Sequence, residues 1–85
     1  MSIQFSIKAW DDYTYWQQTD KRILKKVNSL IQDIARDDPY TGLGKPEPLK
    51  HAFSGFWSRR ITDEHRLVYR VYDDVIQIVQ VRYHY

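Results

Sequence analysis

The sequence contains no cysteine and no long apolar run, and its net charge is small. Without cysteine, disulfides and thiolate metal sites are excluded, which suits a reducing cytoplasm. No segment approaches the roughly 20 apolar residues that a membrane-spanning helix needs, and the N-terminus has no signal-peptide pattern. The net charge of +2 is far below that of proteins that coat nucleic acid by charge alone. We therefore expect a soluble, cytoplasmic protein with no membrane segment.

Core-forming side chains are nevertheless plentiful. Hydrophobic residues make up 42% of the 85 residues and aromatic residues 15%. This composition supports one hydrophobic core and excludes a disordered chain. We find no linker, repeat or low-complexity segment, so the sequence predicts a single domain over residues 1–85.

Hydrophobic periodicity predicts an α+β fold with the element order β-α-α-β-β-β. Residues 2–7 alternate as in a half-buried strand, and aromatic residues at 10, 13 and 16 follow at helical spacing. Thr19 and Asp20 give a cap signal for a second helix, whose apolar stripe comprises Ile23, Val27, Leu30, Ile31 and Ile34. Three strands should follow, at about residues 55–62, 65–72 and from 74 to the end.

Glycine and proline are scarce, and five of the six lie between residues 39 and 48. This cluster predicts a long loop over residues 38–48, and loops of that length in small domains are often functional. Pro46 and Pro48 restrict the backbone on both sides of Glu47. Glu47 is therefore a candidate reactive group, and the alternative is a surface acid in a rigid connector.

In the three last predicted strands, odd-numbered and even-numbered side chains should lie on opposite faces of the sheet. Odd-numbered apolar side chains should face the core: Trp57, Ile61, Leu67, Tyr69, Val71, Val75, Val79 and Val81. The other face then collects Arg60, Arg66, Arg70, Arg82 and His84. A two-residue turn at Asp73 and Asp74 would pair even with odd positions, so this arrangement requires an odd-numbered hairpin loop or a β-bulge.

Arginines gathered on one sheet face repel each other, and an anionic ligand would relieve that repulsion. The alternative is that they turn into water or pair with Asp63 and Glu64. If the ligand were an RNA phosphodiester, metal-independent cleavage would need a base for the 2′-hydroxyl, an acid for the departing 5′-oxygen and cations around the phosphate. Glu47, His84 and Arg66 could fill these roles in that order. Histidine suits proton transfer at neutral pH because its ordinary pKa is about 6.5.

Supporting contacts are also available. Lys50 and Arg60 could bind the phosphate, and Phe53, Tyr83 or Tyr85 could stack on bases. Other chemistries fit less well, because the histidines at 51, 65 and 84 have no ligand spacing for a metal, and Gly42 and Gly44 are too few for a phosphate-binding loop. We expect no metal and no cofactor.

Four segments resemble the YoeB/Txe branch of the RelE/ParE toxin superfamily: GKPEPLKH at 44–51, SGFWSRRIT at 54–62, EHRLVY at 64–69 and RYHY at 82–85. The likeness reaches back through WDDY at 10–13 and DKR at 20–22, and so covers nearly the whole chain. The resemblance implies a RelE-like microbial RNase fold, with two helices packed on a twisted antiparallel sheet. It also implies a type II toxin that cuts mRNA in the A site of the 70S ribosome and is silenced by a YefM-like antitoxin.

Carried over position by position, the resemblance implies Glu47 as general base, Arg66 as phosphate-stabilising cation and His84 as general acid. Lys50, Arg60 and Tyr85 match the supporting positions. Two alternatives stay open: a gyrase-directed inhibitor of the ParE kind, and an RNA-binding module that does not cut. Whether the free protein is a homodimer is also open.

Overall fold

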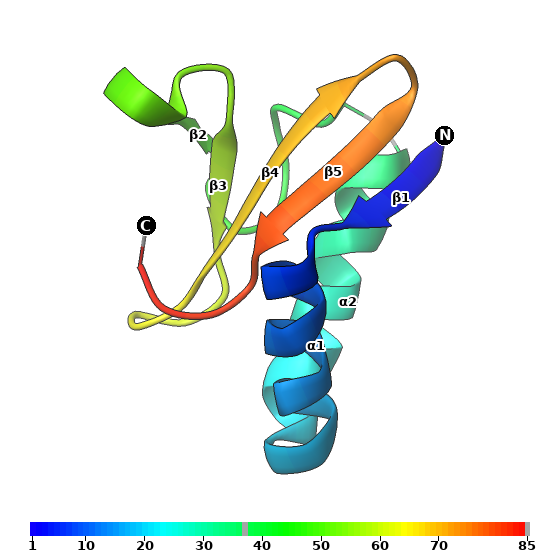
Figure 1. Cartoon of the computed structure of the whole chain (residues 1–85), viewed down its shortest axis with the longest axis vertical. Coiled ribbons are helices and arrows are strands. Elements are labelled where there is room, and N and C mark those ends of the chain that lie inside the picture. The colour runs from blue at the N-terminus through cyan, green and yellow to red at the C-terminus, as the bar shows by residue number, and fades with distance from the viewer. Residues whose placement is uncertain (37, 85) are drawn as a thin grey trace.

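The computed structural model describes residues 1–36 and 38–84, in which two helices lie against a five-stranded sheet (Figure 1). The elements are β1 (Ser2–Phe5), α1 (Ile7–Thr19), α2 (Lys21–Arg36), β2 (Glu47–Pro48), the 3₁₀ turn η1 (His51–Phe53), β3 (Trp57–Arg60), β4 (Arg66–Tyr72) and β5 (Val75–Gln80). The α+β expectation is confirmed. Neither helix within the described ranges is both long and apolar enough to cross a membrane.

The strand order across the sheet is β1-β5-β4-β3-β2. β1 pairs with β5 in parallel, whereas the other neighbouring strands are antiparallel. The parallel pair and the short strand β2, which lies inside the predicted loop, are details that the sequence pattern did not indicate. The sheet is therefore mixed, with β1 at one edge and β2 at the other.

Side-chain caps fix where both helices begin. The hydroxyl oxygen of Ser6 accepts a hydrogen bond from the backbone N–H of Ala9 at 3.1 Å, so α1 begins earlier than the aromatic spacing suggested. A carboxylate oxygen of Asp20 accepts from the N–H groups of Arg22 and Ile23, which confirms the predicted cap of α2. The apolar stripe of α2 is likewise confirmed, because its members at 27, 30, 31 and 34 are buried in the core.

The hairpin between β4 and β5 departs from the parity expectation. A two-residue turn at Asp73 and Asp74 pairs Tyr72 with Val75, and both aspartates adopt positive φ angles, of 48° and 62°. This is the turn geometry that matches the twist of a β-hairpin, and aspartate tolerates it better than most residues. The odd-numbered hairpin loop is therefore wrong.

The predicted bulge is confirmed, and it lies within β5. Tyr69 pairs with Ile78 and Val68 with Gln80, so Val79 is the extra residue. Before the bulge the even positions at 76 and 78 are fully buried, and after it the odd position 81 is fully buried. Core positions for Val75 and Val79 are therefore wrong, whereas Trp57 and Val71, which are also only partly buried, pack against the core as predicted.

The sheet face opposite the helices carries three of the expected arginines. Arg60 and Arg66 are direct cross-strand partners, and Arg70 follows on the same side of β4. Arg82 is not among them, because β5 ends at Gln80 and the alternation stops. Its guanidinium carbon instead lies 3.6 Å from the ring centre of Tyr15 in α1. We call the surface around Arg60, Arg66 and Arg70 the open face.

Candidate active site

Glu47 lies on β2 at the edge of the sheet. It pairs with Ser58 of β3, and the next residue, Pro48, pairs with Trp57. A proline is tolerated there because an edge strand leaves one row of donors unused. Half of the Glu47 side chain is exposed, and a carboxylate oxygen lies 3.4 Å from Nη1 of Arg66. Strand pairing thus directs this carboxylate toward the open face.

Arg66 is the central residue of the candidate site. Its side chain is only 16% exposed and faces Glu47 through Nη1. Its backbone N–H donates to the carbonyl of Tyr83 at 3.0 Å, so Arg66 also contacts the segment that carries His84. The Nε atom is buried and has no hydrogen-bond partner among the described residues. The guanidinium as a whole keeps a small exposed surface, and a charged group of this kind forms strong hydrogen bonds with anions.

His84 follows a sharp reversal of the chain after β5. Its Nε2 atom lies 3.1 Å from the carbonyl oxygen of Asp63, in the turn between β3 and β4. A carbonyl oxygen only accepts hydrogen bonds, so Nε2 is the ring nitrogen that carries the proton. The side-chain amide of Gln80 donates to the carbonyls of Tyr83 and His84 at 3.1 and 2.8 Å. The imidazole is therefore held through Nε2 by the Asp63 carbonyl, and the backbone next to it is held by Gln80.

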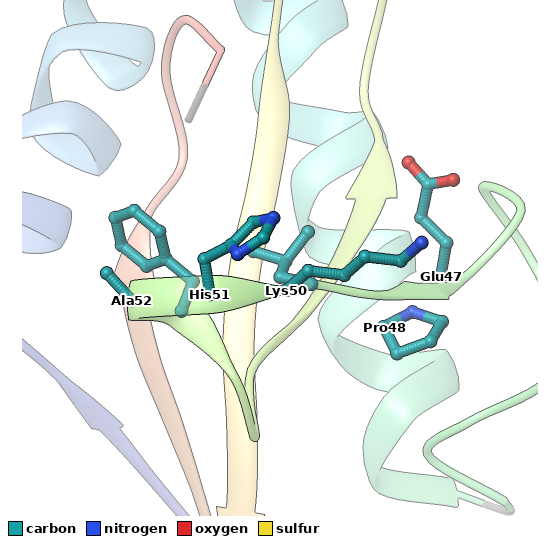
Figure 2. A pocket seen from close by; sticks show the side chains of 7 residues that line it. Glu47, Pro48, Lys50, His51 and Ala52 are labelled. Carbon is teal, nitrogen blue, oxygen red and sulfur yellow. The ribbon is translucent and has the colours of Figure 1, made fainter.

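Of the three predicted reactive residues, Arg66 contacts Glu47 through its side chain, and through its backbone it contacts Tyr83, the neighbour of His84. Figure 2 shows the Lys50 side chain extending along β2 in the direction of Glu47. Arg60 is exposed and its Nη1 lies 4.0 Å from a carboxylate oxygen of Asp63, as the alternative reading of the arginines expected.

An open pocket of about 500 Å³ adjoins Glu47. It is lined by the consecutive residues 47–53, which include Lys50 and the exposed ring of Phe53 (Figure 2). A carboxylate, an ammonium group and an aromatic ring along one pocket suit a ribose, a phosphate and a base.

No group of three or more metal-ligating side chains occurs in the ranges 1–36 and 38–84. The predicted supporting residue Tyr85 lies outside the described residues.

Arg59 is a structural residue that the sequence analysis missed. Its side chain is fully buried, and all five of its N–H groups have acceptors. The acceptors are the Tyr69 hydroxyl at 3.1 Å, an Asp33 carboxylate oxygen at 2.6 Å, and the carbonyls of Leu43, Pro39 and Thr41 at 3.0, 3.0 and 2.8 Å. An arginine at an odd position between Trp57 and Ile61 is the signal that could have revealed it.

The loop before Glu47 is wrapped around this arginine. Gly42 adopts a φ of 111°, and a Cβ atom there would collide with the Asp33 carboxylate. Gly44 adopts a φ of 78°, and its Cβ would lie 2.9 Å from a Leu30 methyl and 3.0 Å from the Arg60 carbonyl. Glycine is required at both positions because other residues fit neither the backbone nor the space. A rigid loop, anchored to the core, thus leads directly into β2.

The Arg59–Asp33 pair should make stability depend on pH. The hydrogen bond from Arg59, followed by that from the Leu43 backbone, lowers the pKa of Asp33 from its ordinary value of 3.8. A lowered folded-state pKa adds stability above that ordinary value, and the added stability is lost as the pH falls through the folded-state pKa. We therefore expect the stability difference between the native protein and Asp33→Asn to shrink below about pH 4.

Urea unfolding between pH 2.5 and pH 7 measures this difference directly. The matched control is Asp11→Asn, which alters an exposed carboxylate on α1. If the difference in free energy of unfolding between the native protein and Asp33→Asn stayed constant over this pH range, the expectation would be contradicted.

Comparison with known proteins finds relatives over the whole chain. A family model described as the YoeB-like toxin of bacterial type II toxin-antitoxin system matches residues 5–85. The toxin YoeB of Escherichia coli K12 is 64% identical over 85 residues, with 100% of each chain covered. The solved YoeB/ParE toxin from Agrobacterium tumefaciens is 49% identical, has a TM-score of 0.96 and is likewise covered over 100% of both chains.

Two solved structures from Staphylococcus aureus are also similar. One is of a YoeB dimer and the other of a YoeB-YefM complex, at 49% and 48% identity. Each has a TM-score of 0.93 and covers 100% of this chain and 98% of the other. The likeness therefore includes both β2, which carries Glu47, and the segment that carries His84.

Proposed function

Because the chain belongs to the family of YoeB-like toxins of bacterial type II toxin-antitoxin systems, we propose that it is an endoribonuclease that cleaves mRNA in the ribosomal A site. The observation that carries this proposal is the arrangement around Arg66. Its guanidinium faces Glu47 and is partly exposed, and its backbone N–H holds the neighbour of His84. A phosphodiester bound there would lie beside the Glu47 carboxylate, and the His84 imidazole would reach it by leaving the Asp63 carbonyl.

In this mechanism Glu47 removes the proton of the 2′-hydroxyl, and the 2′-oxygen attacks the adjacent phosphorus. His84 acts as the imidazolium and transfers a ring proton to the departing 5′-oxygen, which leaves a neutral imidazole, a 2′,3′-cyclic phosphate and a 5′-hydroxyl. Arg66 stabilises the charge that accumulates on the phosphate, assisted by Arg60 and Lys50. The 3.4 Å contact between Arg66 and Glu47 is long for an ion pair. A phosphate can therefore displace it at small cost.

In this proposal the ribosome, rather than the charge of the protein, brings the mRNA to the site. A net charge of +2 gives little non-specific affinity for RNA, so presentation of the mRNA by the 70S ribosome determines where the cut occurs. This function places the protein in the cytoplasm, where translation occurs.

We further propose that a YefM-like antitoxin silences the protein, because the Staphylococcus aureus relative is found in a complex with YefM. Arg60 and Arg66 are cross-strand neighbours of like charge on the open face. An acidic or aromatic segment of the antitoxin would relieve their repulsion and block the site. Homodimer formation, as in the Staphylococcus aureus YoeB dimer, is proposed for the free toxin.

Expression of the protein without an antitoxin should arrest growth by stopping translation. The expected result is an immediate fall in amino-acid incorporation while thymidine incorporation continues, with new mRNA 5′-ends mapping to codons in the A site. Earlier failure of DNA synthesis would instead favour the gyrase-directed alternative. Binding to RNA without new ends would favour the non-catalytic module.

A further inference from the structure

His65, immediately before β4, contacts the segment of residues 81–84 rather than the open face. Its Nδ1 atom accepts a hydrogen bond from the backbone N–H of Tyr83 at 2.8 Å. Its ring packs edge-on against Trp16 of α1, with 4.8 Å between the ring centres. Its own backbone is also held, because its N–H donates to the Thr62 hydroxyl and its carbonyl accepts from Ile61. The imidazole is thus fixed from both sides.

The same segment is anchored at two further points. The indole N–H of Trp16 donates to the Val81 carbonyl at 2.7 Å, and the Val81 N–H donates to Asp12 at 3.1 Å. At Tyr83 the carbonyl accepts from the backbone N–H of Arg66, while the N–H is taken by His65. Both backbone polar groups of Tyr83 are therefore held by two consecutive residues, His65 and Arg66, the second of which begins β4.

This anchoring matters because Tyr83 has a left-handed backbone, with a φ of 64°. A tyrosine adopts that conformation only where surrounding contacts impose it. The reversal turns His84 back toward the β3–β4 turn, where its ring meets the Asp63 carbonyl. If the N–H of Tyr83 lost its acceptor, the backbone would relax and His84 would no longer point to the same place.

We propose that His65 is a positioning residue for His84: its neutral Nδ1 atom holds the Tyr83 N–H and thereby fixes the direction of the acid-bearing segment. The catalytic part of this inference rests on the proposed function. The role needs a side chain with an acceptor at the Nδ1 position, so the tautomer with its proton on Nε2 is the competent one.

Three variants of His65 test its hydrogen-bond acceptor separately from the packing of its ring on Trp16. His65→Phe keeps a ring beside Trp16 and loses the acceptor, whereas His65→Asn loses the ring and keeps an amide oxygen near the Nδ1 position. His65→Gln carries its amide one bond further out and misses that position. We expect His65→Phe and His65→Gln to lower kcat for ribosome-bound mRNA by roughly 5- to 10-fold with little change in KM, as for loss of one hydrogen bond. His65→Asn should recover most of kcat.

Amide hydrogen exchange of Tyr83 in the isolated protein gives a second readout that does not depend on cleavage. Exchange should become about tenfold faster in His65→Phe and His65→Gln but not in His65→Asn. Unchanged exchange in the first two variants, or faster exchange with an unchanged kcat, would overturn the proposal. Should His65→Phe fail to fold, the Asn and Gln pair decides the question alone. A wild-type protein with no cleavage activity would instead refute the proposed function, and the exchange data would still decide whether His65 holds the segment.

Discussion

Replacing His84 by alanine is expected to slow mRNA cleavage by about 100- to 10,000-fold, the usual cost of removing a proton-transfer group. The fold should be retained, because the side chain is exposed and, among residues 1–36 and 38–84, its one hydrogen bond is to the Asp63 carbonyl. The departing 5′-oxygen would have to take its proton from water. Single-turnover cleavage of ribosome-bound mRNA measures the loss, with a thermal melt of the variant to establish that it is folded.

The carboxylate can be examined in the same assay. Glu47→Gln keeps the shape of the side chain and removes its basicity, so a loss of similar size is expected. Glu64→Gln is the matched control, since Glu64 is the other glutamate of the sequence and lies exposed in the turn between β3 and β4. A folded His84→Ala protein with the wild-type rate would eliminate His84 as the acid, and equal rates for the two glutamine variants would eliminate Glu47 as the base.

Replacing Arg59 by methionine should lower the free energy of unfolding by about 3 to 5 kcal/mol, as expected when one partner of a buried ion pair is removed. Methionine fills much of the volume, but the Asp33 carboxylate, the Tyr69 hydroxyl and three loop carbonyls each lose the hydrogen bond from Arg59. Asp33 keeps the bond from the Leu43 N–H, and the Pro39 carbonyl keeps the bond from the Tyr69 hydroxyl. Asp33 is 22% exposed and can gain some water, which favours the lower end of this range. Since small domains have only about 5 to 15 kcal/mol of stability, the variant would be marginal.

Arg60→Met is the matched control, because it changes the next residue of the same strand. The Arg60 side chain is 45% exposed and makes an ion pair of 4.0 Å with Asp63, so the stability change should stay within about 1 kcal/mol. Urea unfolding at neutral pH compares the two variants. Similar losses in both would mean that the hydrogen bonds of Arg59 do not hold the loop.

Helix α2 could be predicted from the sequence because its boundary and its burial have local causes. Asp20 caps the first turn through its own side chain, and the apolar stripe needs only helical periodicity. The β4–β5 hairpin could not be predicted in the same way. Asp73 and Asp74 accept left-handed conformations, and the bulge at Val79 then restores the parity that the turn had shifted.

In the candidate site, too, some features follow from the local sequence and others from tertiary contacts. The stiff residues around Glu47 indicated a presented carboxylate, but its pairing with Ser58 depends on a loop wrapped around Arg59. A buried arginine is unexpected from composition, because its burial requires five acceptors that come from distant parts of the chain. Arg82 likewise does not lie on the expected face because of a tertiary contact: its guanidinium stacks on the ring of Tyr15 in α1. Tertiary contacts, rather than local pattern, decide these positions.

The parallel pairing of β1 with β5 has a consequence for folding of the protein during its synthesis. β1 is synthesised before every other element, yet its neighbour in the sheet, β5, follows them all. A nascent chain that has not reached residue 75 lacks Ile76, Ile78 and Val81, all fully buried in the finished core. Sequence-distant contacts of this kind form late in folding. We therefore expect the growing polypeptide to lack a complete sheet, and with it the proposed cleavage activity, until β5 has left the exit tunnel.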